Sequence, residues 1–304
     1  MRPVARVTGM AAPTVLLATC DEWPAGEPAA GELDRELAAR GLAARWVAWD
    51  DPDVDWAEAD LVAVRSTWDY VTRHREFLRW AERVGTSTRL LNGADVFVWN
   101  HDKAYLTDLD ELPVVPTLLA DDRAGLSAAV RELGRAVVKP RVGAGGAGLL
   151  VVDDPDDSRL GTSVASHSTY PPVGGPWIVQ PVVESVRTVG EVSVFTIAGR
   201  PVGRVDKRPA AGEVRVNEQF GGTLAVGRLD GETAALAERA VATVAQGFGH
   251  AVDYCRVDLM WLDGGWVVGE LELIEPGLYL DVVPGNAVPF ADLVHERAHE
   301  PVDC

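Results

Sequence analysis

Apolar and polar positions in the first third of the chain follow the order of an α/β domain. The runs TVLLAT (14–19) and ADLVAVRS (59–66) are mostly apolar and rich in β-branched residues, as in strands that are buried on both faces of a sheet. Between them, ELDRELAARG (32–41) repeats its apolar residues with helical spacing and ends in glycine. This alternation predicts a mostly parallel sheet with helices on both faces.

Two polar loops follow strands of this predicted sheet, CDEW (20–23) and RSTWDY (65–70). Ligands of open α/β sheets bind beyond the carboxyl ends of the strands. A guanidinium beside an acid suits the carboxylate and ammonium groups of an amino acid. The second loop is therefore predicted to present four residues to the substrates: Arg65, Thr67, Trp68 and Asp69.

The remaining two thirds of the chain show a different pattern. The stretch RAVVKPRVGAGGAGLLVV (135–152) predicts a strand, a glycine-rich loop and a second strand. Beyond Val189 most of the pattern is β-like and antiparallel, interrupted by a helix near 233–247 and closed by a hairpin. The predicted class is α/β, with an α+β C-terminal part, and the predicted parts are residues 1–94, 95–184 and 185–304.

Composition narrows the functional classes. With 46 acidic residues against 28 lysines and arginines, the net charge is −18, which argues against nucleic-acid and membrane-surface binding. No apolar run approaches the roughly 20 residues of a membrane span. Three cysteines are too few and too scattered for a disulfide framework. These features together predict a cytoplasmic protein.

Only three of the 28 basic residues are lysines, namely Lys103, Lys139 and Lys207. In a chain that otherwise uses arginine, a lysine marks a place where a compact ammonium is needed. Lys139 lies four residues before the loop GAGGAG (143–148), which a β-like run follows at once. The loop is therefore predicted to be a hairpin flap whose N–H groups close over phosphates. A dinucleotide-dependent oxidoreductase is disfavoured, because its glycine motif must open a helix.

The final hairpin, RVDLMWLDGGWVVGELEL (256–273), is predicted to turn at Asp263-Gly264-Gly265. In that register Leu262 faces Trp266, and Asp258 lies opposite Glu270. A two-residue turn would place Asp258 and Glu270 on opposite faces, so this prediction depends on the register.

Strand alternation adds Glu272 to the face of Asp258 and Glu270. Like-charge repulsion opposes three clustered carboxylates unless a cation lies among them. Hard oxygen ligands without a nearby histidine or cysteine favour Mg²⁺. A glycine flap, scarce lysines and a carboxylate cluster together describe a site for a nucleoside triphosphate and Mg²⁺.

The order of these parts resembles the ATP-grasp superfamily of carboxylate–amine ligases, in the branch of glutathione synthetase and D-alanine–D-alanine ligase. The resemblance implies an ATP-grasp fold and an acyl-phosphate intermediate, with ADP and phosphate released and a C–N bond formed. Where the family pattern ends in asparagine, this chain has Glu272.

The resemblance also implies roles by position. It implies that the ATP phosphates contact Lys103, Lys139, Gly143, Gly145, Gly146 and Gly148. It implies that the adenosine contacts Gln180, Pro181, Val182, Val183, Glu184 and Glu191. It implies that Mg²⁺ is bound by Asp258, Glu270 and Glu272, and that the phosphoryl transfer is served by Lys207 and Arg215.

The substrates are predicted to be a small-molecule carboxylate and an amine, with an amino acid or small amino-acid derivative as the acid. The chain also resembles cyclising relatives of the cycloserine synthetase type, so intramolecular ligation is an open alternative. A nucleotide-binding regulator without turnover is a second alternative, although the intact lysine and carboxylate positions argue against it. The oligomeric state, including a homo-oligomer, stays open.

Overall fold

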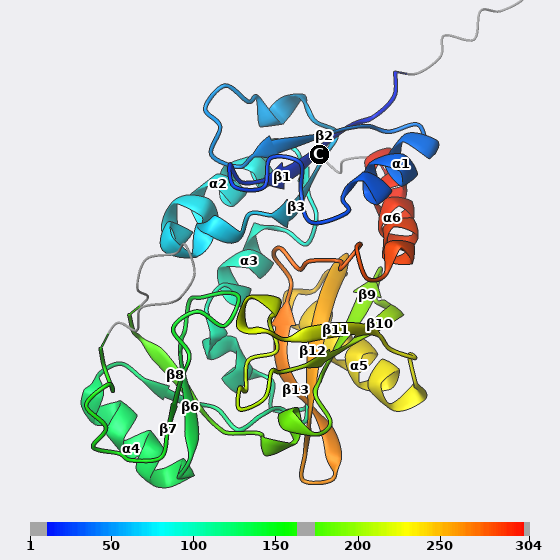
Figure 1. Cartoon of the computed structure of the whole chain (residues 1–304). Coiled ribbons are helices and arrows are strands. Elements are labelled where there is room, and N and C mark those ends of the chain that lie inside the picture. The colour runs from blue at the N-terminus through cyan, green and yellow to red at the C-terminus, as the bar shows by residue number, and fades with distance from the viewer. Residues whose placement is uncertain (1–10, 163–173, 301–304) are drawn as a thin grey trace, which may run out of the picture.

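The computed structural model describes residues 11–162 and 174–300 of the 304-residue chain. Its strands form three sheets, one in each third of the chain (Figure 1). None of the helices in the described ranges combines the length and apolar content that a membrane span requires.

The N-terminal sheet is parallel, with strand order β2-β1-β3-β4. Every residue of β3 is buried, as the apolar run predicts for a strand that is covered on both faces. The parallel sheet predicted from the alternating pattern is confirmed. Its elements are β1 (Thr14–Thr19), α1 (Gly31–Ala39), β2 (Ala43–Ala48), β3 (Leu61–Ser66), α2 (His74–Ser87) and β4 (Arg89–Leu90).

The central sheet is antiparallel, with strand order β5-β8-β6-β7, and α3 (Ala94–Asn100) leads into it. Strands β6 and β7 form the hairpin predicted around the glycine loop. The elements of this part are β5 (Leu118–Ala120), α4 (Arg123–Leu133), β6 (Ala136–Pro140), β7 (Leu150–Val152) and β8 (Trp177–Pro181).

The C-terminal sheet is antiparallel, with strand order β11-β10-β9-β12-β13. Helix α5 packs its apolar side on this sheet and contributes Leu236, Ala240 and Val244 to the core. The elements are β9 (Glu191–Ile197), β10 (Arg200–Arg208), β11 (Thr223–Val226), α5 (Gly231–Phe248), β12 (Tyr254–Leu262) and β13 (Gly265–Glu272). Short 3₁₀ helices lie at Trp56–Glu58, Trp68–Thr72, Lys103–Asp108, Glu184–Arg187, Glu218–Phe220 and Pro284–Asn286.

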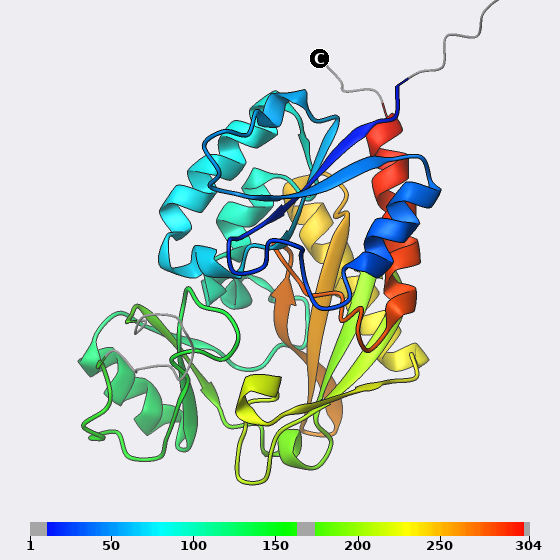
Figure 2. The same ribbon diagram turned by 45° about the horizontal axis from the view of Figure 1, so that its top comes forward.

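Helix α6 (Ala287–His299) returns to the N-terminal part and lies beside α1 (Figures 1 and 2). Phe290 and Leu293 of α6 share one core with Leu33 and Leu37 of α1. The N-terminal and C-terminal parts of the sequence therefore share a hydrophobic core. The boundaries at 94 and 184 stay predictions.

Arg65 joins the N-terminal part to the segment that follows β13. Its side chain is buried and forms an ion pair with Glu27 at 2.9 Å. The same guanidinium donates to the Pro276 carbonyl at 2.7 Å, and Glu27 accepts from the Leu278 N–H at 2.6 Å. The prediction that Arg65 faces the substrates is wrong, because its charge is enclosed and is neutralised by a buried acid.

We expect Glu27→Gln to lower the free energy of unfolding by about 3 kcal/mol, because it leaves the buried Arg65 charge without its counterion. Urea unfolding followed by circular dichroism measures this change. Asp292→Asn is the control, since it breaks the exposed ion pair with Arg40 and is expected to change stability by less than about 1 kcal/mol. Equal effects of the two substitutions would contradict a structural role for the buried pair.

Candidate active site

A cavity of about 620 Å³ lies where the three parts of the chain meet. Its size is within the usual range for sites that enclose a small molecule. The glycine loop, strand β8 and the β12–β13 hairpin all contribute to its lining. Trp23 and Trp68 of the N-terminal part also line it.

Lys103 and Lys139 both line this cavity, and Lys103 contacts the glycine loop. Lys103 forms an ion pair with Glu270 at 3.0 Å and donates to the Gly143 carbonyl. Lys139 also lines the cavity, and within the described ranges no carboxylate lies at ion-pairing distance from it. Burial lowers the pKa of Lys139, so an anionic ligand would favour its charged form.

The glycine loop has the backbone that only glycine adopts without strain. Gly145, Gly146 and Gly148 have φ of +60°, +71° and +71°. A Cβ atom on Gly146 would lie 3.0 Å from the Asn217 side-chain oxygen, and the Gly145 carbonyl accepts from Gln219 at 2.8 Å. The loop therefore packs directly on the segment after β10.

The predicted phosphate-binding glycines do not all reach the cavity. Gly143, Gly145 and Gly146 line it, whereas Gly148 does not. Gly148 stands just before β7 and contributes to the turn of the loop.

The predicted adenosine contacts divide in a similar way. The cavity lining includes Gln180, Pro181, Val182, Val183 and Glu191. The Glu184 side chain is 53% exposed and forms ion pairs with Arg135 and Arg187. Its predicted polar contact with the nucleotide therefore needs correction, because two surface arginines bind this carboxylate outside the cavity.

The β12–β13 register brings Asp258 opposite Glu270, as predicted. The predicted turn is nevertheless wrong: Leu262 pairs with Gly265, so the turn has two residues and not three. A bulge at Gly269 adds one residue to β13 and restores the pairing beyond it. Without this bulge, Asp258 and Glu270 would lie on opposite faces.

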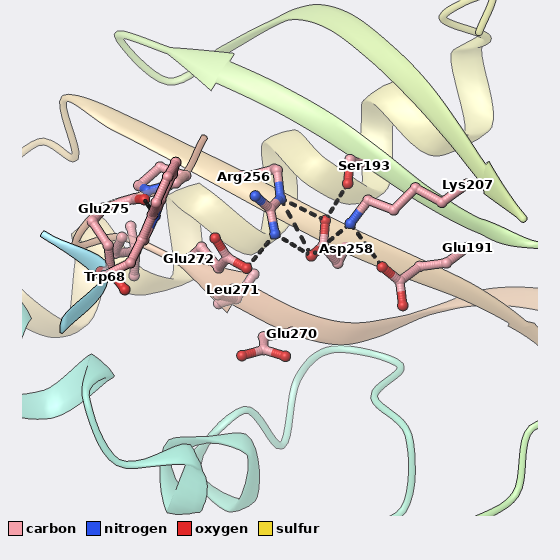
Figure 3. Close-up of polar contacts among 12 residues, drawn as sticks. Trp68, Glu191, Ser193, Lys207, Arg256, Asp258, Glu270, Leu271, Glu272 and Glu275 are labelled. Carbon is pink, nitrogen blue, oxygen red and sulfur yellow. Dashed lines mark hydrogen bonds and ion pairs between the residues drawn. The ribbon is translucent and has the colours of Figure 1, made fainter. Parts of the chain in front are cut away.

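The cation among these carboxylates is Arg256, a residue that the sequence reasoning missed. Its guanidinium lies 2.9 Å from Asp258 and also forms an ion pair with Glu272 (Figure 3). Arg256 stands two residues before Asp258 and directly opposite Glu272. Strand alternation was therefore a signal that would have found it.

Lys207 completes this network from the neighbouring strand β10. Its ammonium lies 2.8 Å from Glu191 and 3.3 Å from Asp258 (Figure 3). The lysine is 3% exposed, so solvent screens these ion pairs less than it screens pairs at the surface. Arg215 also lines the cavity, and its guanidinium stacks on Phe220 at 3.6 Å.

Burial and neighbouring charges lower the pKa of one acid in the cavity and raise the pKa of two others. Burial raises the pKa of Asp258, but the charges of Arg256 and Lys207 outweigh it and hold that pKa below its usual range. Burial, with the charges of Asp258 and Glu270, raises the pKa of Glu272 to about 7 despite Arg256. Burial, and then the charge of Glu272, raises the pKa of Glu275 to about 8.

The metal prediction has a chemically suitable donor set, since Asp258, Glu270 and Glu272 offer only carboxylate oxygens. As the side chains lie, the described ranges contain no group of three or more His, Cys, Asp or Glu arranged around a metal position. Each of the three acids instead has a lysine or arginine partner. The ligand set for Mg²⁺ stays a prediction.

On the substrate side, one of the four predicted residues lines the cavity. Trp68 does so, and its indole N–H donates to the Glu275 carbonyl at 3.1 Å. Thr67 is fully buried, and Asp69 accepts from Trp49 and pairs with Arg73. The prediction is wrong for Thr67 and Asp69, because neither side chain reaches the cavity.

Glu275 is a second residue that the sequence reasoning missed. It is 9% exposed and lines the cavity together with Tyr70 and Tyr279. Glu275 lies in a loop, three residues beyond the end of β13, where no strand or helix periodicity predicts the direction of its side chain.

Comparison with known proteins identifies the family. Residues 15–92 match the family model of the D-cycloserine synthetase DcsG N-terminal domain, and residues 102–250 match that of the prokaryotic glutathione synthetase ATP-grasp domain. The cycloserine biosynthesis protein DcsG of Streptomyces lavendulae is 32% identical over 282 residues, which cover 84% of this chain and 89% of that protein. A glutathione synthetase of Prochlorococcus marinus is 28% identical over 294 residues, which cover 92% of this chain and 89% of that enzyme.

Solved structures agree with this result. The crystal structure of D-cycloserine synthetase DcsG superposes with a TM-score of 0.80 at 28% identity, covering 94% of this chain and 99% of that one. D-alanine–D-alanine ligase from Bacillus anthracis, complexed with ATP, superposes with a TM-score of 0.63 at 15% identity, covering 94% and 97%, and so shares the fold.

The fold and the matched models define an ATP-grasp enzyme, an ADP-forming ligase that makes carbon–nitrogen bonds. Within that class, the chain belongs to the DcsG family. The ATP-grasp fold and the ligase activity predicted from the motifs are confirmed, and the oxidoreductase and regulator alternatives receive no support from these relatives.

The raised pKa of Glu275 predicts a specific pH dependence of stability. Below the unfolded pKa of 4.5, both states hold the proton; between 4.5 and about 8 only the folded state does, so burial of Glu275 destabilises the protein increasingly as pH rises. The unfolding free energy of Glu275→Gln minus that of wild type is expected to be about 3 kcal/mol larger at pH 8.5 than at pH 5.5, because only wild type loses stability as Glu275 ionises. Urea unfolding of both proteins at the two pH values measures this gain, and a difference independent of pH would contradict the assignment.

Proposed function

We propose that this ligase binds Mg²⁺ and ATP between the central and C-terminal sheets and activates a small carboxylate as an acyl phosphate. The convergence of Lys103, Lys139 and Lys207 with the Asp258–Glu270 pair in one cavity carries this proposal. Cations and carboxylates arranged around one space are the groups that phosphoryl transfer requires.

The adenine would lie along residues 180–183, at the end of β8 and just beyond it, where Pro181, Val182 and Val183 line the cavity. The triphosphate would extend under the glycine loop and toward Lys139, whose ammonium has no carboxylate partner among residues 11–162 and 174–300. Asp258, Glu270 and Glu272 are the residues that would hold Mg²⁺. When bound, this ion neutralises charge on the phosphates as the phosphoryl group moves.

The reaction proceeds in two steps. An oxygen of the substrate carboxylate attacks the γ-phosphorus of ATP in line, the bond to the β–γ bridging oxygen breaks, and ADP leaves. A substrate nitrogen then attacks the acyl carbon, phosphate departs, and the nitrogen loses a proton to leave a C–N bond. Lys207 and Arg215 would stabilise the charge on the transferring group, and Arg256 would stabilise the acyl oxygen.

The N-terminal part supports an intramolecular version of this reaction. It matches the N-terminal domain model of D-cycloserine synthetase, and it closes the substrate end of the cavity with Trp23 and Trp68. We therefore propose that one amino-acid derivative supplies both the carboxylate and the nitrogen, so that ligation closes a ring.

An assay of ADP release and product mass tests this proposal. The full-length protein is incubated with ATP, Mg²⁺ and 2-amino-3-(aminooxy)propanoate, the acid that opening of the cycloserine amide bond gives. Ring closure predicts ADP and a product one water lighter than the acid. Pooled amino acids and small acids form a second arm, in which a product that joins two molecules would favour intermolecular ligation. ATP binding without ADP release in either arm would contradict the proposed reaction.

We expect Glu270→Gln to reduce ATP turnover by at least about 100-fold, because the substitution removes a charge that the predicted Mg²⁺ site needs. The fold is expected to persist, since Glu270 and its partner Lys103 line the cavity and are 28% and 12% exposed, so the lysine is not left in the apolar core. Glu238→Gln on the exposed side of α5 is the matched control, with unchanged turnover. A folded, fully active Glu270→Gln protein would count against the metal assignment.

A further inference from the structure

Among the residues that the structure describes, one buried acid at the proposed substrate end of the cavity has no counterion. Glu275 is 9% exposed and lines the cavity. Asp258, Glu270 and Glu272 each have a cation within ion-pairing distance, but in residues 11–162 and 174–300 no lysine, arginine or histidine lies that close to Glu275. A buried carboxylate without a counterion is costly unless a ligand supplies the charge.

The N-terminal part holds the backbone around this acid. The Trp68 indole N–H donates to the Glu275 carbonyl (Figure 3), and Arg65 donates to the next carbonyl, that of Pro276. Glu27 accepts from the Leu278 N–H. Three fixed contacts in four residues mean that the Glu275 side chain is positioned before a ligand arrives.

The surroundings of the acid suit an organic cation. The indoles of Trp23 and Trp68 meet edge to face with centroids 5.1 Å apart, and both line the cavity. Tyr70 is buried and lines the cavity, and burial, followed by the charge of Glu275, raises the pKa of its phenol. Aromatic rings attract ammonium groups over their faces. Among the described residues, Glu275 belongs to no group of three or more His, Cys, Asp or Glu side chains that could hold a metal ion.

We propose that Glu275, with Trp68 and Tyr70, forms the subsite that binds the primary ammonium group of the amino-acid substrate. The inference rests on the proposed function, because it assigns one end of the same ligand. The substrate carboxylate would then point toward Arg256 and Lys207, where the phosphoryl group is transferred. Under this assignment Arg65, Glu27 and Trp68 are positioning residues for the ammonium subsite, with Trp68 also in contact with the ligand.

Matched ligand pairs that differ only in the amino group test this proposal. Calorimetry on the full-length protein with Mg²⁺ and ADP compares cycloserine with isoxazolidin-3-one, the same ring without the amine. Wild type is expected to bind cycloserine more tightly by about 10- to 100-fold, the effect of a hydrogen bond between charged groups. In Glu275→Gln this preference is expected to fall below about threefold, with affinity for isoxazolidin-3-one unchanged.

Two further variants separate charge from shape. Glu275→Asp keeps the carboxylate and is expected to retain part of the amine preference. Glu238→Gln removes an exposed charge on α5 and is expected to retain all of that preference. The KM for ATP and the urea midpoint are recorded for each variant. A Glu275→Gln protein that folds but loses both ligands equally would indicate a merely structural role and overturn the proposal.

The remaining outcomes are also decisive. Equal affinity of wild type for the two rings, or no binding of either, overturns the ammonium subsite. A Glu275→Gln protein with an unchanged amine preference overturns it as well. Failure of the proposed cyclisation is a different result, because it is recorded as absent ADP release with the aminooxy acid, while the calorimetric comparison of the two rings does not require turnover.

Discussion

The arrangement of the cavity depends on the neutralisation of buried carboxylates by the protein's own cations. Asp258, Glu270 and Glu272 come from one pair of strands and would repel one another if left alone. Arg256, from the same hairpin, bridges two of them, and Lys103 arrives from a 3₁₀ helix to bind the third. The hairpin can therefore fold before any nucleotide or metal is present.

These ion pairs also explain how such a site can accept a triphosphate. A lysine that binds Glu270 in the free protein is available to a phosphate once another cation takes its place on the carboxylate. Under the proposed function, Mg²⁺ would be that replacement, so the total charge around the acids would change little on binding. Lys139 has no carboxylate partner in the described ranges, so under the proposed function it would need no such exchange and would be the first contact for the phosphates.

The parallel sheet, the β6–β7 hairpin and the antiparallel character of the C-terminal part could be predicted because their sequence signals are local. Alternating patterns, glycine turns and apolar runs predicted the parallel sheet and the β6–β7 hairpin. The Asp258–Glu270 pairing was also predicted, but through two errors that cancel: the turn is one residue shorter than expected, and a bulge at Gly269 adds that residue back. A bulge depends on how both strands fit the sheet, so periodicity alone cannot place it.

The substrate side was predicted poorly, because its contacts are not local. Arg65 lies at the end of β3 and Asp69 lies just beyond it, so both fit the rule for ligand-binding loops. Arg65 nevertheless pairs with Glu27, 38 residues away, and reaches Pro276, 211 residues away. A polar residue in such a loop can bind a ligand or secure another segment, and only the packing decides between the two. Here the N-terminal part acts mainly in the second way. It fixes the loop that carries Glu275, so a residue with no motif of its own is held at the cavity by residues from the opposite end of the chain.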